Sequence, residues 1–201
     1  MFIPELKKKN YFRYFQLSAS NREINKSTIY FLLLEAELNN VFSNICDPVL
    51  KKIKYQWYIE ELEKKKSNHS LINNILQIEK QKVYLLTKLS IVYSNFSDQD
   101  YVINNWECLF KDVLKIYEEY FDQNYLRTSI LFLFCYFIYR NKISFLSTEL
   151  KNYLQFEYVK NKKSINITER TFLEIFFSKH KKINKIEFLL RYYINTIRYL
   201  K

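Results

Sequence analysis

The most restrictive feature of this 201-residue sequence is that it contains no glycine. Glycine is the usual residue at positive backbone angles and in the loops that wrap phosphate groups. Its absence excludes the glycine-rich phosphate and dinucleotide motifs and leaves asparagine to end helices and form turns. The chain also has only two prolines and 48% hydrophobic residues. With so few helix breakers, the sequence predicts an all-α protein with a substantial core.

The clearest helical pattern lies between Tyr30 and Glu63, around the dipeptide Asp47-Pro48. Before this dipeptide, apolar residues recur at steps of three and four, at Phe31, Leu34, Leu38, Val41, Phe42 and Ile45. Aspartate suits the N-cap of a helix and proline its first turn, so we expect one helix to end and another to begin here. The residues expected to continue the buried face beyond the corner are Leu50, Ile53 and Trp57. The pattern therefore predicts a helical hairpin.

Further helices are predicted on both sides of this hairpin. The full set of predicted ranges is 11–17, 27–46, 48–66, 71–93, 97–121, 125–140, 148–158, 168–180 and 183–200. Ser27 or Thr28 is expected to cap the second of these helices and Thr168 the eighth, while residues 1–9 are read as a basic lead-in. The 97–121 helix has a regular apolar face, and the 125–140 helix is apolar nearly all round and is expected to be buried. We expect residues 1–201 to form a single domain.

The formal charge of +11 favours an anionic partner or reflects an A/T-rich genome, which would raise Lys, Asn, Ile, Tyr and Phe together. Cys46, Cys108 and Cys135 are far apart and, with His69 and His180, show no metal-ligand spacing. The first residues lack the apolar segment of a signal peptide, and the longest apolar run is about half of the roughly twenty residues that span a bilayer. We expect a chain that is cytoplasmic or peripheral at the inner membrane of a bacterium, or mitochondrial.

Three short patterns resemble the squalene/phytoene synthase family, in the branch that includes a mitochondrial assembly factor for respiratory complex I. Phe12-Arg13-Tyr14-Phe15 is similar to the family's Asp-Arg-Tyr-aliphatic signature, and Arg22 followed by Glu35-Ala36-Glu37-Leu38 is similar to its next helix. The run from Ile53 to Leu62 is similar to Ile-Arg-Leu-Gln-Trp-Trp-Arg-Asp-Ala-Leu. The resemblance is best over residues 10–65 and weaker over 125–150. It implies a shortened, single-domain helical bundle of the isoprenoid synthase type.

Active members of that family condense two isoprenoid diphosphates, and magnesium ions held by two Asp-rich motifs neutralise the leaving diphosphate. The first motif would fall at residues 39–43, where Asn39, Asn40 and Ser43 stand in place of aspartates. The second would fall at residues 126–140, where the sequence has no carboxylate. We therefore expect no metal, no cofactor and no catalytic residue. Magnesium is expected only in the alternative, an active prenyltransferase that uses other carboxylates, such as Glu35, Glu60 and Glu61.

The candidates for lining a cavity or binding a ligand are Arg13, Arg22, Glu37, Asn39, Asn40, Gln56, Trp57 and Arg127. The arginines are either remnants of diphosphate binding or members of ion pairs at the surface or between helices. Gln56 and Trp57 either line an isoprenoid-like cavity or serve as a helix–helix hydrogen bond and a core residue. Glu37 resembles a residue of the non-catalytic branch, and it would form a structural ion pair if buried near Arg13 or Arg22.

The resemblance thus implies a non-catalytic assembly or chaperone factor for respiratory complex I. Such a factor would bind a protein partner at the respiratory membrane, with an isoprenoid-like apolar ligand and peripheral membrane contact as further options. The first alternative is the active prenyltransferase, and the second is a basic helical module that binds nucleic acid or anionic lipid. Nucleic acid is the least expected partner, because no nucleic-acid motif accompanies the aromatic residues and lysines.

Overall fold

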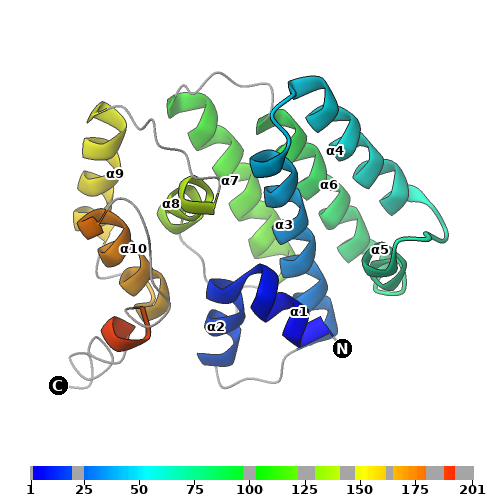
Figure 1. Cartoon of the computed structure of the whole chain (residues 1–201), viewed down its shortest axis with the longest axis horizontal. Coiled ribbons are helices and arrows are strands. Elements are labelled where there is room, and N and C mark those ends of the chain that lie inside the picture. Colours follow the sequence, from blue (N-terminus) through cyan, green and yellow to red (C-terminus); the bar gives the residue numbers. More distant parts are fainter. Residues whose placement is uncertain are drawn as a thin grey trace. The chain divides into compact units, whose positions relative to one another are not determined.

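A computed structural model of the chain describes residues 2–19, 25–96, 103–121, 130–140, 148–161, 165–179 and 188–192. All regular secondary structure in these ranges is helical, which confirms the predicted all-α class (Figure 1). The chain forms two compact units, residues 1–123 and 124–201, each with its own set of helices. The single domain expected over residues 1–201 stays a prediction.

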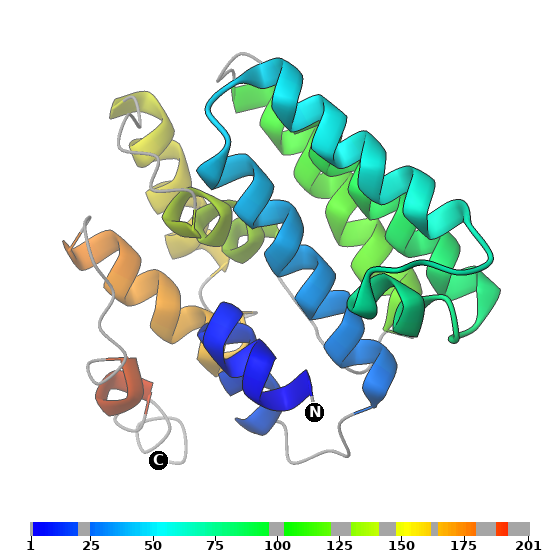
Figure 2. The same ribbon diagram turned by 45° about the vertical axis from the view of Figure 1, so that its right-hand side comes forward.

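The first unit is built around one buried helix, α3. Its helices are α1 (Phe2–Lys9), α2 (Tyr11–Ala19), α3 (Lys26–Asn44), α4 (Pro48–Glu63), α5 (Ser70–Ile75), α6 (Lys80–Phe96) and α7 (Ile103–Tyr120). Helix α3 packs against α1, α4, α5 and α6, and it runs along α4 in Figure 2. Phe31 of α3 also contacts the rings of Tyr117 and Phe121, at centroid distances of 4.6 and 4.8 Å. Because neighbours surround α3, its burial extends well beyond the single face that periodicity predicts.

The corner between α3 and α4 forms as the sequence predicts. One carboxylate oxygen of Asp47 accepts hydrogen bonds from the backbone N–H groups of Val49 and Leu50, at 2.8 and 3.1 Å, and Pro48 opens the helix. At the other end of α3, the predicted cap is wrong. Asn25 accepts the bond from the Ser27 N–H at 3.0 Å, whereas Ser27 itself is buried inside the helix. Asparagine caps helices at least as well as serine.

The side of α4 that faces the core differs from the predicted one. Leu50 and Ile53, which were expected to continue the buried face, are 55% and 59% exposed. The buried apolar residues are instead Tyr55, Tyr58 and Leu62, which recur at steps of three and four. Both sets fit a helical period, and the tyrosines occupy the core because their hydroxyl groups find acceptors there. This reversal leaves an aliphatic surface on the outer side of α4.

The predicted helix 71–93 is interrupted. It consists of α5 and α6, separated by a tightened turn in which the N–H groups of Gln77 and Ile78 bond the carbonyls three residues earlier. The basic lead-in of residues 1–9 contains α1, a further difference from the prediction. By contrast, α7 buries the predicted apolar face wherever its side chains are described, at Leu109, Phe110, Val113, Tyr117 and Phe121.

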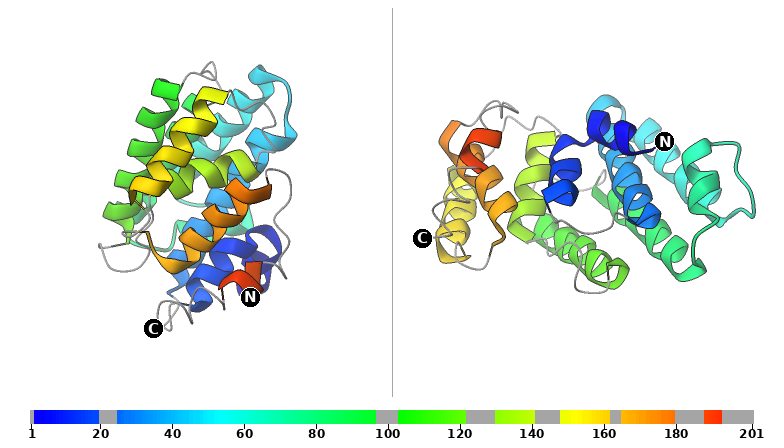
Figure 3. Two further views of the ribbon diagram at one scale, coloured as in Figure 1. Left: turned by 90° about the vertical axis from the view of Figure 1, so that its left-hand side faces the viewer. Right: turned by 90° about the horizontal axis from the view of Figure 1, so that it is seen from below.

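The second unit contains α8 (Ile130–Arg140), α9 (Thr148–Asn161) and α10 (Ile167–Lys179), and residues 188–192 are also helical. Helix α8 runs across α9 and α10 rather than alongside them (Figure 3, left). Its described side chains are almost all buried, as predicted, and the ring of Phe132 lies 5.2 Å from that of Phe172. Asn166, rather than the predicted Thr168, supplies the oxygen that bonds the first turn of α10. The predicted helix 183–200 falls mostly outside the described residues.

Among the described helices, none is both long enough and apolar enough to cross a membrane.

Candidate functional site

A buried ion pair joins α2 to α3 at the place where the resemblance suggests diphosphate chemistry. Arg13 donates from Nε and Nη2 to the two carboxylate oxygens of Glu35, each at 3.4 Å. Arg13 is 0% exposed and Glu35 is 1% exposed. Nη1 of Arg13 also donates to the side-chain oxygen of Gln16 at 2.9 Å. Each charge is therefore compensated by protein groups where water has no access.

Tyr117 of α7 completes this cluster. Its hydroxyl group donates to Oε1 of Glu35 and accepts from Nη2 of Arg13 at 2.8 Å. The guanidinium carbon of Arg13 also lies 5.1 Å from the centre of the Tyr117 ring. Burial raises the pKa of the Tyr117 hydroxyl well above its usual value, although the charge of Arg13 opposes the shift. At neutral pH the hydroxyl is therefore a neutral donor that satisfies Glu35.

Asn39 occupies the first position of the expected Asp-rich motif and acts as a hydrogen-bond donor. Its side-chain nitrogen donates to the backbone carbonyl of Glu35 at 2.8 Å and to the hydroxyl of Tyr93 on α6 at 2.9 Å. Asn39 is 2% exposed, and burial raises the pKa of Tyr93 well above its usual value. An aspartate here could not donate to the Glu35 carbonyl, so the amide is the group that this position requires.

The other two positions of that motif lie nearer the surface of α3. Asn40 is half-buried and Ser43 is exposed. The Ser43 hydroxyl donates to the backbone carbonyls of Asn39 and Asn40, at 3.0 and 3.4 Å. Neither side chain is acidic, so this turn of α3 presents no anionic metal ligand between residues 39 and 43.

Tyrosines from α4 and α7 also fasten α3. The hydroxyl of Tyr55 donates to the carbonyl of Leu38 at 3.1 Å, and that of Tyr120 donates to the carbonyl of Ser27 at 3.0 Å. These bonds use acceptors that the helix ladder leaves partly unused, since a carbonyl has two lone pairs. Together with Tyr93 and Tyr117, they make α3 the point of attachment for three neighbouring helices.

Glu37 forms an ion pair, though with a different partner from those predicted. Nζ of Lys9 contacts Glu37 and also Glu5, the latter at 2.8 Å. The Tyr58 hydroxyl donates to the second carboxylate oxygen of Glu37 at 3.4 Å. Arg13 pairs instead with Glu35, which lies two residues before Glu37 on α3. Residues two apart on a helix point to different sides, so the two glutamates have different partners. The other arginine considered for this pair, residue 22, and Arg127 lie outside the described residues.

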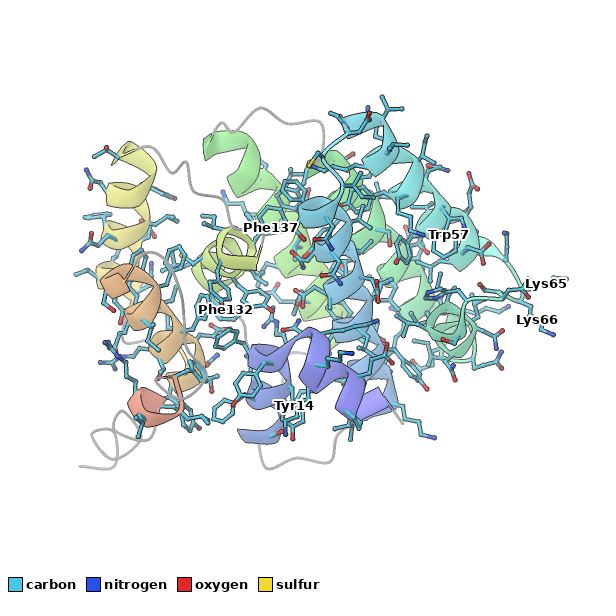
Figure 4. All side chains as sticks on the ribbon, in the orientation of Figure 1. Tyr14, Trp57, Lys65, Lys66, Phe132 and Phe137 are labelled. Carbon is cyan, nitrogen blue, oxygen red and sulfur yellow. The ribbon has the colours of Figure 1, made fainter. Side chains whose placement is uncertain are left out.

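Gln56 does not form the predicted helix–helix hydrogen bond, and Trp57 is only partly buried. Gln56 is exposed, and its side chain donates to Glu60 one turn along the same helix, at 3.1 Å. Trp57 is half-buried; Nζ of Lys54 lies 3.9 Å from the centre of its ring, and the ring of His69 lies 5.6 Å away. Figure 4 shows Trp57 on α4. The prediction that Trp57 is a core residue holds only in part.

The carboxylates that the alternative enzyme would use do not come together in one site. Glu61 accepts hydrogen bonds from Lys64 and Ser67, which hold its pKa below the usual value. Glu60 is exposed and bonded to Gln56, whereas Glu35 is buried with its arginine. Over the ranges that the structure describes, no three His, Cys, Asp or Glu side chains come together in a way that could hold a metal ion.

The sequence predicted Arg13 and Asn39 as site residues, and Glu35 was considered only as a carboxylate of the alternative enzyme. Tyr93 and Tyr117, which bond these residues, were not predicted. Periodicity placed Tyr117 correctly on an apolar face, but it carries no information on where the hydroxyl points. The signal that was present is a pair of polar residues at helical spacing in apolar surroundings. Glu35 and Asn39 are four residues apart on a helix that is otherwise buried, which predicts a polar contact inside the core.

Compared with known proteins, the chain matches no family model, and no curated protein and no solved structure is significantly similar to it.

Proposed function

We propose that this chain is a non-catalytic helical protein of the squalene/phytoene synthase type. In this proposal it acts as an assembly or chaperone factor for respiratory complex I, and it binds a protein partner at the inner membrane. The observation that carries the proposal is the chemistry of α3 between Glu35 and Ser43. The buried amide of Asn39 donates its protons inward, and the nearest carboxylate, Glu35, is neutralised by Arg13.

The physical argument concerns the leaving diphosphate. Ionising an isoprenoid diphosphate requires cations, and cations require anionic ligands that are not already paired. Glu35 accepts hydrogen bonds from Arg13 and Tyr117 on both of its oxygens. Releasing it for a magnesium ion would leave the guanidinium of Arg13 buried without its partner, which is strongly unfavourable. A structural role for the cluster agrees with these contacts, and a metal-binding role conflicts with them.

The alternative of an active prenyltransferase would need at least three carboxylates around one cavity. Glu35, Glu60 and Glu61 have separate partners and different exposures. These positions favour the non-catalytic proposal.

Absence of turnover is tested by incubating the purified chain with farnesyl or geranylgeranyl diphosphate and magnesium. Released diphosphate and extracted lipid products are then quantified. The proposal predicts the same signal with and without protein. Magnesium-dependent product formation that chelator removes would overturn it.

The assembly role requires a separate experiment in the organism that encodes the chain. Deleting the gene is expected to lower the amount of fully assembled complex I on native gels, without a matching loss of the other respiratory complexes. Cross-linking of a tagged chain is expected to recover complex I subunits or assembly intermediates. Normal complex I in the deletion strain would refute the role even if no turnover is found.

A further inference from the structure

We propose that the outer face of α4 is a contact surface for anionic lipid bilayers. The face, named the α4 face below, consists of Val49, Leu50 and Ile53 with the exposed corner residues Cys46 and Pro48. The inference deepens the proposed function, because it supplies the means by which the chain would reach a membrane. It is tested with lipid alone, so it can fail while the partner and turnover experiments succeed.

The first argument is the exposure of aliphatic side chains. Val49 is 64% exposed, Leu50 55% and Ile53 59%. They lie on the side of α4 opposite Tyr55 and Tyr58, which are 0% and 3% exposed. On a helix, positions 49, 50 and 53 fall within one turn and form a continuous apolar surface. Contiguous exposed apolar surface of this kind is typical of an interaction site.

The second argument is the charge around that surface. Lys52 and Lys54 lie at the two edges of this surface, whereas Lys51 points to the core side, with Nζ 4.5 Å from the centre of the Phe42 ring. Asp47 precedes the surface, and the next acidic residue on this side, the exposed Glu60, lies two turns beyond Ile53. The carboxylate of Asp47 is engaged by the backbone N–H groups at the start of α4. Lys65 and Lys66 lie beyond the opposite end of α4 (Figure 4) and do not belong to this surface. An apolar centre flanked by lysines is complementary to an anionic bilayer surface.

The third argument separates lipid from nucleic acid. Nucleic-acid surfaces combine basic side chains with exposed aromatic rings or with arginine that reads base edges. The centre of the α4 face is aliphatic, and α4 contains no arginine. The half-buried ring of Trp57 is covered by Lys54, at 3.9 Å. Branched aliphatic side chains gain free energy by entering the acyl region, whereas they gain little against phosphates and bases.

The geometry also sets the expected depth of binding. A helix in the plane of the interface buries its apolar side to the boundary between headgroups and acyl chains. The lysines beside that side have long apolar stems and can keep their ammonium groups among the headgroups. Cys46, two residues before α4, is exposed and would lie at this boundary.

Binding is measured with the full chain by co-sedimentation with vesicles of phosphatidylcholine, alone or mixed with phosphatidylglycerol. We expect binding to the mixed vesicles only, and we expect added salt to weaken it. The Val49→Ser/Ile53→Ser double variant is expected to reduce the partition coefficient at least about tenfold. The matched control is Phe156→Ser/Val159→Ser, which removes two equally exposed apolar residues from α9 (65% and 70%) and should leave binding unchanged.

The charge contribution is measured with Lys52→Gln, which should weaken binding to the anionic vesicles about fivefold. The matched control is Lys115→Gln on α7, a 70% exposed lysine whose loss changes the net charge equally. All four variants alter exposed side chains, so their circular dichroism and thermal unfolding should match the wild type. If the Val49→Ser/Ile53→Ser chain unfolds, it is replaced by Leu50→Ser, which alters a 55% exposed residue of the α4 face.

Depth is measured with an environment-sensitive fluorophore on Cys46 in a Cys108→Ser chain, and on Cys108 in a Cys46→Ser chain. Both cysteines are exposed, and Cys135 is buried. Anionic vesicles should shift the emission of the Cys46 label to the blue and leave the Cys108 label unchanged. The proposal would be overturned if the chain did not bind vesicles, if the α9 control lost as much vesicle binding as the α4 variant, or if both labels shifted equally. It would also be overturned if the chain preferred duplex DNA and this binding were insensitive to Val49→Ser/Ile53→Ser.

Discussion

The guanidinium of Arg13 contacts the carboxylate of Glu35 from two nitrogens at 3.4 Å, and both side chains are excluded from solvent. The two residues are 22 positions apart and belong to different helices. Their pairing therefore fixes α2 against α3, the helix around which the first unit is built. Because each charge depends on the other for compensation, the pair is expected to respond very differently to single and double substitution.

The first prediction concerns this pair. Arg13→Met leaves Glu35 buried without its cation and should lower the free energy of unfolding by about 3–5 kcal/mol. Arg13→Met/Glu35→Leu removes both charges and should recover most of that loss. Urea denaturation of the full chain measures both values. The control is Lys115→Met, which breaks an exposed pair with Asp112 and should have almost no effect. A loss below about 1 kcal/mol for Arg13→Met would contradict the assigned role.

The second prediction concerns Asn39. Asn39→Asp introduces the residue found in the squalene/phytoene synthase motif, but it replaces a buried donor by an acceptor facing the Glu35 carbonyl. We expect a loss of about 1–3 kcal/mol in the free energy of unfolding. We also expect no thermal stabilisation by magnesium, since one carboxylate does not make a metal site. Asn40→Asp, one position along and half-buried, is the matched control and should change stability much less. Stabilisation of the Asn39→Asp chain by magnesium would refute this account.

The third prediction concerns alkaline pH. Burial raises the pKa of Tyr55, Tyr58, Tyr93, Tyr117 and Tyr120 above the usual value of 10.0. Above pH 10 the unfolded chain releases these protons while the folded chain keeps them, so stability is present below pH 10 and falls as pH rises further. Each tyrosine should contribute a slope that is half of about 1.4 kcal/mol per pH unit at pH 10 and approaches that full value above pH 11.

Urea denaturation between pH 8 and pH 11 measures this slope. Tyr93→Phe removes one titrating hydroxyl and should reduce the loss of stability at pH 11 by about 1.4 kcal/mol. A free energy of unfolding that stays level up to pH 11 would show that these hydroxyls are not held as described.

The fourth prediction concerns the orientation of α4. Tyr55→Phe removes the hydroxyl that bonds the Leu38 carbonyl and should lower the free energy of unfolding by about 0.5–1.5 kcal/mol, since the carbonyl keeps its bond within α3. Ile53→Ser, two residues earlier on the exposed side, should change it by less than about 0.5 kcal/mol. Chemical denaturation of the two variants gives the comparison. The reverse order of effects would mean that Ile53, and not Tyr55, faces the core.

Some parts of this fold are predictable from the sequence and others are not. The corner at Asp47 and Pro48 is predictable because a capping carboxylate and a proline in the first turn act through local geometry. The face of α7 is predictable because its apolar and charged residues separate cleanly around the helix. On α4 the pattern is ambiguous, since aliphatic residues and tyrosines both recur at helical spacing. Tyrosine occupies the core only because α3 offers acceptors, and no local pattern contains that information.

The residues of the candidate site also fall into those that the sequence predicts and those that only the packing reveals. Arg13 and Asn39 were predicted as site residues through the family resemblance, whereas Glu35 was considered only as a carboxylate of the alternative enzyme. The choice of Glu35 over Glu37 as the partner of Arg13 depends on the side of α3 that meets α2, which is a tertiary property. The same holds for Tyr117, whose sequence position is far from the residues that it bonds. Long-range partners of this kind follow from packing and not from spacing.

The most direct test of the central claim is diphosphate release from farnesyl diphosphate by wild type and Glu35→Gln side by side, with and without magnesium. The account assigns Glu35 a structural role, so it predicts background release in all four samples. Magnesium-dependent release by the wild type that Glu35→Gln abolishes, with both proteins folded, would contradict it.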